Sequence, residues 1–222
     1  MSSPLATSPP SPFQPPSRDC PRCPRLVGFR QDLRGQHPDW QNAPVPSFGT
    51  LDAPLLVVGL APGLRGANRT GRPFTGDYAG ELLYATLSKF GFAQGVYRAD
   101  PNDGLHLVDC RIANAVRCLP PENKPLPAEF TNCRPFLQAE LAVMPKVKVL
   151  LALGKGAHDQ ILRALTVRPA GNYPFIHNRL HKLPAGLHLA DSYHCSRYNT
   201  NTGRLTTEMF EDVFAKVRAA LP

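Results

Sequence analysis

The sequence predicts an α/β fold in which helices cover both faces of a mostly parallel sheet. Two observations predict it. Four apolar runs have the length and composition of buried strands, at residues 55–60, 105–116, 147–153 and 187–190. A helical pattern follows each run, and strands that alternate with helices are typical of a parallel sheet.

The helical patterns are marked by apolar residues spaced three and four apart. After the first run the apolar positions are Leu82, Leu83, Leu87 and Phe90, and after the last they are Met209, Phe210, Val213, Phe214 and Val217. Thr206 or Thr207 is the expected N-cap of this last helix. Cys133 is expected to enter the helix after the second run, with Pro135 in its first turn.

The first 17 residues differ in composition from the rest of the chain. They contain six prolines, five serines and no charged residue. Such a segment cannot bury enough apolar surface to offset the entropy lost on ordering, so we predict a disordered tail over 1–17 and one domain over 18–222. No run has the length of a membrane span, and the N-terminus lacks the features of a signal peptide. We therefore expect a cytoplasmic protein with reduced cysteines.

The chain is basic, with 25 Lys and Arg against 17 Asp and Glu and a formal net charge of +8. Most of the cations are arginine, which pairs with phosphate through two parallel hydrogen bonds. This balance favours a polyanionic partner, although an ordinary basic protein would also show it.

Ligands of such sheets bind beyond the carboxyl ends of the strands. The first run ends in a glycine-rich loop, from Gly59 to Gly80, that also carries Arg65, Arg69 and Arg72 as candidate phosphate partners. Phe74 in this loop could stack on a base or serve as a hydrophobic anchor. Asp77 could cap the following helix or orient a water molecule.

The loop after the fourth run begins with His194 and continues to Arg204. An imidazole at this place could donate a hydrogen bond to an oxygen that gains negative charge in a transition state. A histidine that only satisfies the loop would fit the same pattern.

Four cysteines have the spacing of metal ligands. Cys20 and Cys23 form a C-x-x-C pair, and 14 residues separate Cys118 from Cys133. Four thiolates could hold zinc or a [4Fe-4S] cluster, and spacing does not separate the two. A redox pair or unconnected thiols remain alternatives. Cys110 lies in a strand pattern and is expected to be a buried apolar residue.

Several motifs occur together, in order, over about 200 residues. They are Gly59-Leu60-Ala61-Pro62-Gly63, Gly71-Arg72-Pro73-Phe74-Thr75-Gly76-Asp77, the segment from Asn114 to Cys118 with its continuation to Pro125, Cys133, and the loop from His194 to Arg204. In these motifs the sequence resembles the iron-sulfur uracil-DNA glycosylases, most closely family five.

The resemblance implies a three-layer α/β/α sandwich, a structural [4Fe-4S] cluster and excision of uracil from DNA. The implied cluster ligands are Cys20, Cys23, Cys118 and Cys133.

The resemblance also implies site roles. Phe74 would stack on the flipped base, Asn114 would bind its Watson-Crick edge, and His194 would face uracil O2. Backbone amides near Gly63 would stabilise the leaving anion, and Asn123 is a less certain contact. Asn199 would hold the loop or touch the DNA.

In family-four enzymes and other relatives, an acidic residue or asparagine in the first motif handles the water. Leu60 and Ala61 stand in that stretch here, as in family five, which makes Asp77 the candidate for handling water. The motif that begins at His194 often reads His-Pro-Ser in the family, and this sequence has Cys195 in place of the proline, which removes a stiff turn.

We expect a monomer that acts on DNA containing uracil or other deaminated bases such as hypoxanthine. One alternative is a nucleotide-binding transferase, but neither a phosphate loop nor a ribose-binding acid is found. A non-catalytic, metal-stabilised DNA-binding module would explain the charge and the cysteines, but not the residues that gather at the strand ends.

Overall fold

The computed structural model describes residues 13–221. The main elements are α1 (Pro24–Gln36), β1 (Leu55–Gly59), α2 (Ala67–Thr70), α3 (Tyr78–Lys89), β2 (Ala93–Gln94), β3 (His106–Leu107), β4 (Cys110–Asn114), α4 (Pro127–Ala142), β5 (Val149–Leu153), α5 (Lys155–Ala164), β6 (Leu180–Lys182), β7 (His188–Ser192), α6 (Arg197–Asn201) and α7 (Thr207–Ala219). Three single turns of 3-10 helix lie at Pro121–Asn123, Ala170–Asn172 and Pro184–Gly186.

Five strands form the central sheet in the order β4-β1-β5-β7-β6. The first four run parallel, and β6 is antiparallel to β7 at the edge. All residues of β1, β4 and β5 are buried, as a parallel sheet covered on both faces requires. The predicted mostly parallel sheet is confirmed.

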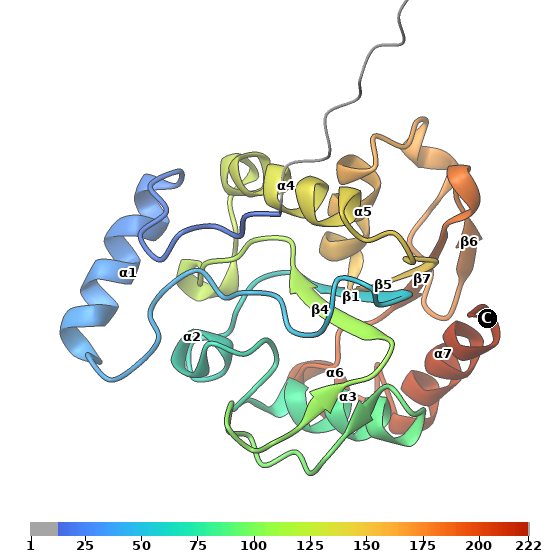
Figure 1. Cartoon of the computed structure of the whole chain (residues 1–222), viewed down its shortest axis with the longest axis horizontal. Coiled ribbons are helices and arrows are strands. Elements are labelled where there is room, and N and C mark those ends of the chain that lie inside the picture. The colour runs from blue at the N-terminus through green and yellow to red at the C-terminus, as the bar shows by residue number, and fades with distance from the viewer. Residues whose placement is uncertain (1–12, 222) are drawn as a thin grey trace, which may run out of the picture.

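Side chains of each central strand alternate between two helical layers. In β1, Leu55 and Val57 pack into the core between the sheet and helices α3 and α7, whereas Leu56 and Val58 pack into the core between the sheet and helices α4 and α5. Figure 1 shows α4 and α5 above the sheet and α3, α6 and α7 below it. The molecule is therefore the three-layer α/β/α sandwich that the resemblance implied.

The predicted run 105–116 is not one strand. It divides into β3, which pairs with β2 in a separate two-stranded sheet, and β4, which joins the central sheet. Asp109 separates the two and has a left-handed backbone, with φ of 52°. A single extended strand cannot pass through that conformation.

The helix that carries Cys133 begins earlier than expected. It starts at Pro127, and the Glu129 carboxylate accepts a hydrogen bond from the backbone N–H of Leu126 at 2.7 Å. Pro127 fits the first turn because its missing N–H needs no partner there. The expectation that Pro135 lies in the first turn was wrong, because Pro135 is inside α4 and Cys133 lies mid-helix.

Two helices begin at residues that the sequence named. Asp77 caps α3, and the Thr206 side chain accepts from the N–H of Met209 at 3.2 Å at the start of α7. Within residues 13–221, no helix combines the length and apolar character needed to cross a bilayer. Residues 1–12 of the predicted tail lie outside the described part of the chain.

Candidate active site

The carboxyl ends of β1 and β4 meet at Gly59 and Asn114, which are register partners. A Cβ atom on Gly59 would overlap Asn114 Oδ1 and would lie 2.6 Å from Phe74 Cζ. Only glycine leaves room for this approach. The missing side chain therefore lets the Asn114 amide and the Phe74 ring meet at the end of the central strand.

Asn114 is only 2% exposed, and its Oδ1 accepts no hydrogen bond from the described residues. A buried acceptor without a partner costs about 1–3 kcal/mol, so such atoms are rare away from sites that receive a ligand. The structure thus presents an acceptor that a ligand N–H can satisfy.

The Phe74 ring lies with its centroid 5.9 Å from that of His194. Its backbone is left-handed, with φ of 52°, and this strain is held by the residues around it. Arg72 binds Asp103 through two hydrogen bonds of 2.8 Å and donates to Thr75 Oγ1 at 2.7 Å. The expectation that Arg72 serves as a phosphate partner is corrected, because its guanidinium is buried in this structural role.

Asp77 uses its two oxygens in different ways. Oδ1 accepts from the N–H of Gly80 at 3.2 Å, which is an N-cap contact. Oδ2 lies against the loop after β1, since a Cβ on Gly66 would overlap it and a Cβ on Gly63 would lie 3.0 Å away. Burial raises the pKa of the Asp77 carboxyl.

His194 follows β7, and burial lowers its pKa to about 4. The imidazole is therefore neutral near pH 7 and keeps one N–H to donate. Asn199 Nδ2 donates to the carbonyl of His194 at 2.8 Å. Of the two roles considered for Asn199, the described contact is the one that holds the loop.

Beside His194 the structure shows stacked side chains that the sequence did not reveal. The ring of His177 lies parallel to that of Tyr193 at 4.7 Å, and the Arg204 guanidinium lies 4.7 Å from the centroid of the same Tyr193 ring. Together with Lys155, Asn199 and His194 they line an open cleft of about 530 Å³. Lys155 and Arg204 were visible as polar residues after strands, but stacking between distant segments has no local sequence signal.

Asn123 is not brought to this group. It is exposed on the turn Pro121–Asn123, with a left-handed backbone. Within the described residues its one hydrogen bond is from its backbone N–H to the carbonyl of Pro120.

The four predicted metal ligands Cys20, Cys23, Cys118 and Cys133 line one small pocket, together with Leu26, Val116 and Phe136. All four are free thiols. Burial raises the pKa of Cys118 to about 12 and also raises that of Cys133.

The cysteine pocket also supplies hydrogen-bond donors to sulfur. The N–H of Arg117 lies 3.3 Å from Cys133 Sγ, and Arg30 Nη1 lies 3.7 Å from Cys118 Sγ. Both contacts lower the pKa of these cysteines, although burial is the larger effect and leaves it raised, and they stabilise the thiolate form that a metal requires. The residues of the pocket therefore fit a group that is ligated by four cysteines.

A second group of ligand-type side chains lies apart from the cysteines. His158, His181 and Asp191 are buried, and their ligand atoms lie within 4.8 Å of one another. His158 Nδ1 is 2.6 Å from Asp191 Oδ1, and His181 Nε2 is 3.2 Å from Asp191 Oδ2. The first distance is that of a direct hydrogen bond, so this group is an internal polar network.

Known proteins resemble this chain over most of its length. The family model of the uracil DNA glycosylase superfamily matches residues 46–218. The chain is 43% identical over 205 residues to a type-5 uracil-DNA glycosylase of Thermus thermophilus, covering 90% of this chain and 92% of the relative. It is 41% identical over 203 residues to one of Mycobacterium leprae, covering 88% of each, and 39% identical over 206 residues to one of Pyrobaculum aerophilum, covering 90% and 88%.

Proposed function

The chain belongs to the uracil DNA glycosylase superfamily, and on that basis we propose that it is a monofunctional DNA repair glycosylase. It flips uracil out of DNA and hydrolyses the N-glycosidic bond, which leaves an abasic site. One observation carries the proposal beyond family membership. The unpaired Asn114 Oδ1 lies beside the Phe74 ring, in the same group as His194.

The pocket offers what recognition of a flipped base needs. A base inside a duplex is unreachable, so it must leave the stack at a cost of a few kcal/mol. The Watson-Crick edge of uracil carries one N–H between two carbonyls, and Asn114 Oδ1 can accept from it. The Phe74 ring supplies a face on which the base can stack.

His194 and Asp77 supply the chemistry. As the bond breaks, uracil leaves as an anion and the sugar becomes cationic. The neutral imidazole of His194 donates to uracil O2, and backbone amides near Gly63 add to this stabilisation. Asp77 Oδ2, which the cap contact leaves free, orients the attacking water and stabilises the cation.

A [4Fe-4S] cluster held by Cys20, Cys23, Cys118 and Cys133 is part of the proposal. The four cysteines line one pocket, which supports a single group that all four ligate. Zinc held by the same four thiolates is the alternative, and metal analysis of the purified protein separates the two. When bound, the cluster would cross-link the α1 end of the chain to α4, with no redox step in hydrolysis.

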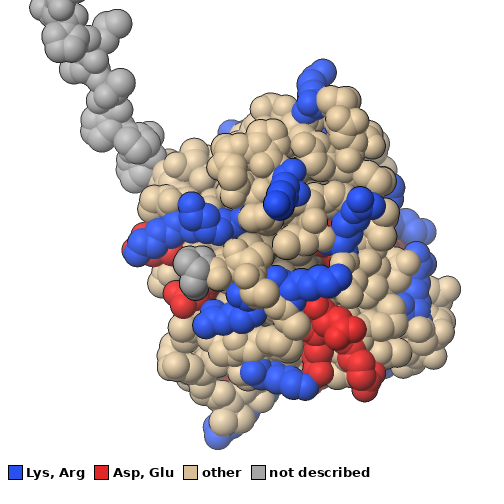
Figure 2. Space-filling model, turned by 90° about the vertical axis from the view of Figure 1, so that its right-hand side faces the viewer, with Lys and Arg blue, Asp and Glu red and all other residues tan. Residues whose placement is uncertain are grey.

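Arginines near the site would hold the DNA backbone. Arg65 and Arg69 are exposed in the loop after β1, and Arg197 is exposed where it stacks on Tyr78 at 5.2 Å. Figure 2 shows Lys and Arg spread widely over one face of the molecule, with Asp and Glu at fewer places on it. We further propose a monomeric, cytoplasmic enzyme that also accepts other deaminated bases such as hypoxanthine, and Asn123 is kept as a contact with DNA.

The test is alkali-induced cleavage of an end-labelled duplex with one U·G pair, incubated with purified protein. Cleavage at the uracil after alkali, and none without alkali, is the expected result. A protein that binds this duplex but releases no uracil would support the alternative of a non-catalytic DNA-binding module. Duplexes with hypoxanthine or with thymine in place of uracil serve as the second substrate and the control.

A further inference from the structure

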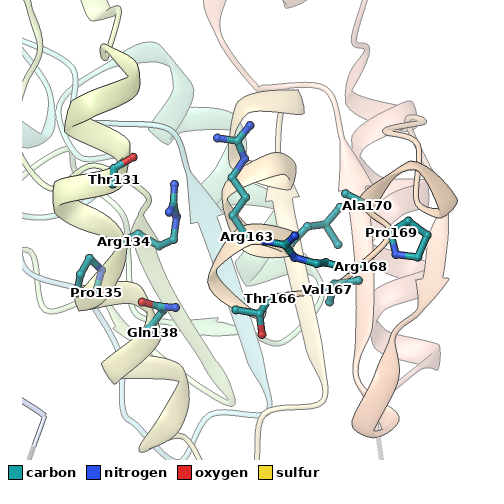
Figure 3. A pocket seen from close by; sticks show the side chains of 11 residues that line it. Thr131, Arg134, Pro135, Gln138, Arg163, Thr166, Val167, Arg168, Pro169 and Ala170 are labelled. Carbon is teal, nitrogen blue, oxygen red and sulfur yellow. The ribbon is translucent and has the colours of Figure 1, made fainter.

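A large hollow of the described molecule lies away from the strand ends. It has a volume of about 830 Å³ and lies between α4 and the segment from the end of α5 to Ala170. Figure 3 shows Arg134 on α4 facing this hollow from one side and Arg163 and Arg168 from the other. We call it the α4–α5 groove.

The α4–α5 groove is strongly cationic. No acidic side chain lines it, and none of its three arginines forms an ion pair within residues 13–221. Arg163 and Arg168 are exposed. Among the described residues, Arg134 Nε is buried without a partner, and Arg134 Nη2 has only a weak contact of 3.4 Å to Gln160. Three like charges kept together repel one another unless an anion joins them.

The other lining residues suit a phosphodiester. Thr131, Thr166 and Gln138 add neutral hydrogen-bonding groups of the kind that contact phosphates. Val167 and Pro169 give apolar surface on which a sugar can rest. The N-terminal tail cannot neutralise the groove, because residues 1–17 contain no acidic side chain.

The α4–α5 groove lies close enough to the active site for a DNA strand to pass from one to the other. A Cβ on Gly154, at the start of α5, would lie 3.6 Å from His194 Cβ, and the groove lies at the other end of this helix. The 10 residues of α5 span about 15 Å. A rigid duplex across the strand ends would not follow α5 down the side of the molecule, whereas a flexible single strand can.

We propose that the α4–α5 groove binds the backbone phosphates of a single-stranded DNA flank next to the lesion. The choice of DNA as the polymer rests on the proposed function, whereas the charge and shape of the groove do not. Arg163 and Arg168 supply forked, two-point contacts, and Arg134 completes the site from α4.

The test measures binding to thymine-containing DNA, so that it does not depend on uracil release. One probe is a blunt duplex, and two others carry a single-stranded flank of about eight nucleotides, longer than the ~15 Å path, on the 5′ or the 3′ side. The Arg163→Ala/Arg168→Ala double variant should bind at least one flanked probe roughly tenfold more weakly, with a salt dependence smaller by about 1.4 in logarithmic slope. Its affinity for the blunt duplex should stay the same.

Arg218→Ala is the matched control, because Arg218 is exposed on α7 in the opposite layer. The proposal is overturned if the double variant binds both flanked probes as this control does. A second outcome also overturns the proposal: inorganic phosphate protects the wild type, but not the double variant, from unfolding, while flanked DNA binds both proteins equally. The groove would then bind free phosphate and not DNA. If the wild type releases no uracil, the proposed function is contradicted, but the binding measurement on the α4–α5 groove is unaffected.

Discussion

At the scale of single residues, the two carboxylate oxygens of Asp77 have different roles, one in capping a helix and one at the candidate active site. Oδ1 caps α3 through Gly80, and Oδ2 faces the glycines of the loop after β1. Both roles were predicted from the sequence. The capping role is confirmed, and the role in handling water stays a prediction that depends on where Oδ2 is held.

Gly66→Ala tests whether the position of Asp77 Oδ2 matters for the reaction, without changing Asp77 itself. The new Cβ would overlap Oδ2 and lie 2.7 Å from Asp77 Cγ, so the carboxylate must move. A displacement of about 1 Å can cost a catalytic group roughly a hundredfold in rate. We expect uracil release under single-turnover conditions to fall by at least tenfold.

Gly28→Ala and Gly35→Ala are the matched controls, because a Cβ at either position would have no neighbour within 4 Å among the described residues outside the backbone of its own helix. Both should release uracil at the wild-type rate. If Gly66→Ala does the same, the oxygen facing Gly66 has no part in the reaction.

The pH dependence of uracil release follows from the two pKa shifts. Asp77 acts as an anion, and its raised pKa means that activity falls with acidity at a higher pH than an ordinary aspartate would give. His194, with a pKa of about 4, is already neutral at pH 6 to 8. A pH–rate profile should therefore show no loss as pH rises through about 6.5, where an imidazolium would deprotonate. A loss in that range would contradict a neutral His194.

The local sequence was enough to name Phe74, Asn114 and His194 as candidate site residues, because each lies in a recognisable motif or directly after a strand. It led to the wrong prediction that Arg72 binds phosphate, since its partner Asp103 is 31 residues away and no local pattern reveals it. Long-range partners decide whether an arginine serves the fold or a ligand.

At the scale of elements, burial on both faces made the central strands predictable. The runs that became β1 and β5 are continuous apolar segments, as buried parallel strands are. The antiparallel edge strand β6 has only three residues, and its Leu-His-Lys sequence carries no strand pattern. Its pairing with β7 comes from tertiary structure.

The network around Asp191 ties β7 to α5 and β6. His158 faces Asp191 Oδ1 with one ring nitrogen and the carbonyl of Tyr173, at 2.9 Å, with the other. Both partners are acceptors, so both nitrogens carry hydrogen and the ring is cationic. Burial is the largest single effect on the pKa of His158 and lowers it, but the hydrogen bond and charge of Asp191, together with the Tyr173 carbonyl, outweigh burial and leave the pKa raised.

A raised pKa means that the folded state binds this proton more tightly than the unfolded state. The resulting stability is complete below about pH 6.5 and is lost as pH rises through the raised pKa. His158→Asn should lower the free energy of unfolding at pH 6 by about 1–3 kcal/mol, and the deficit should shrink toward pH 8.5. Urea unfolding at both values, with the exposed His106→Asn as control, measures this. A deficit independent of pH would mean that His158 is neutral.

At the scale of the whole molecule, the cysteine pocket joins the start of the described chain to the α4 layer. Cys20 and Cys23 precede or begin α1, whereas Cys133 lies within α4. Among the described residues, the apolar cluster between them has three buried members, Leu26, Val116 and Cys133. So small a core supports our proposal that a bound iron-sulfur cluster stabilises this part of the molecule.

Cys118→Ala should therefore abolish bound iron and sulfide and lower the temperature of unfolding. Cys110→Ala is the control, because Cys110 is buried in β4 outside the cysteine pocket. The wild type and the control should be brown, with broad absorbance near 400 nm, as iron-thiolate groups give. Zinc in place of iron in protein purified without oxygen would refute the cluster assignment.

The most direct test of the account is the rate at which Asp77→Asn releases uracil from a U·G duplex, measured beside the wild type in a single turnover. The amide oxygen of asparagine can still cap α3, so the fold and the bound iron should be retained. The account predicts a rate lower by at least about tenfold, as expected on loss of a positioned acid or base. Release at the wild-type rate would contradict it and leave Asp77 only as the cap of α3.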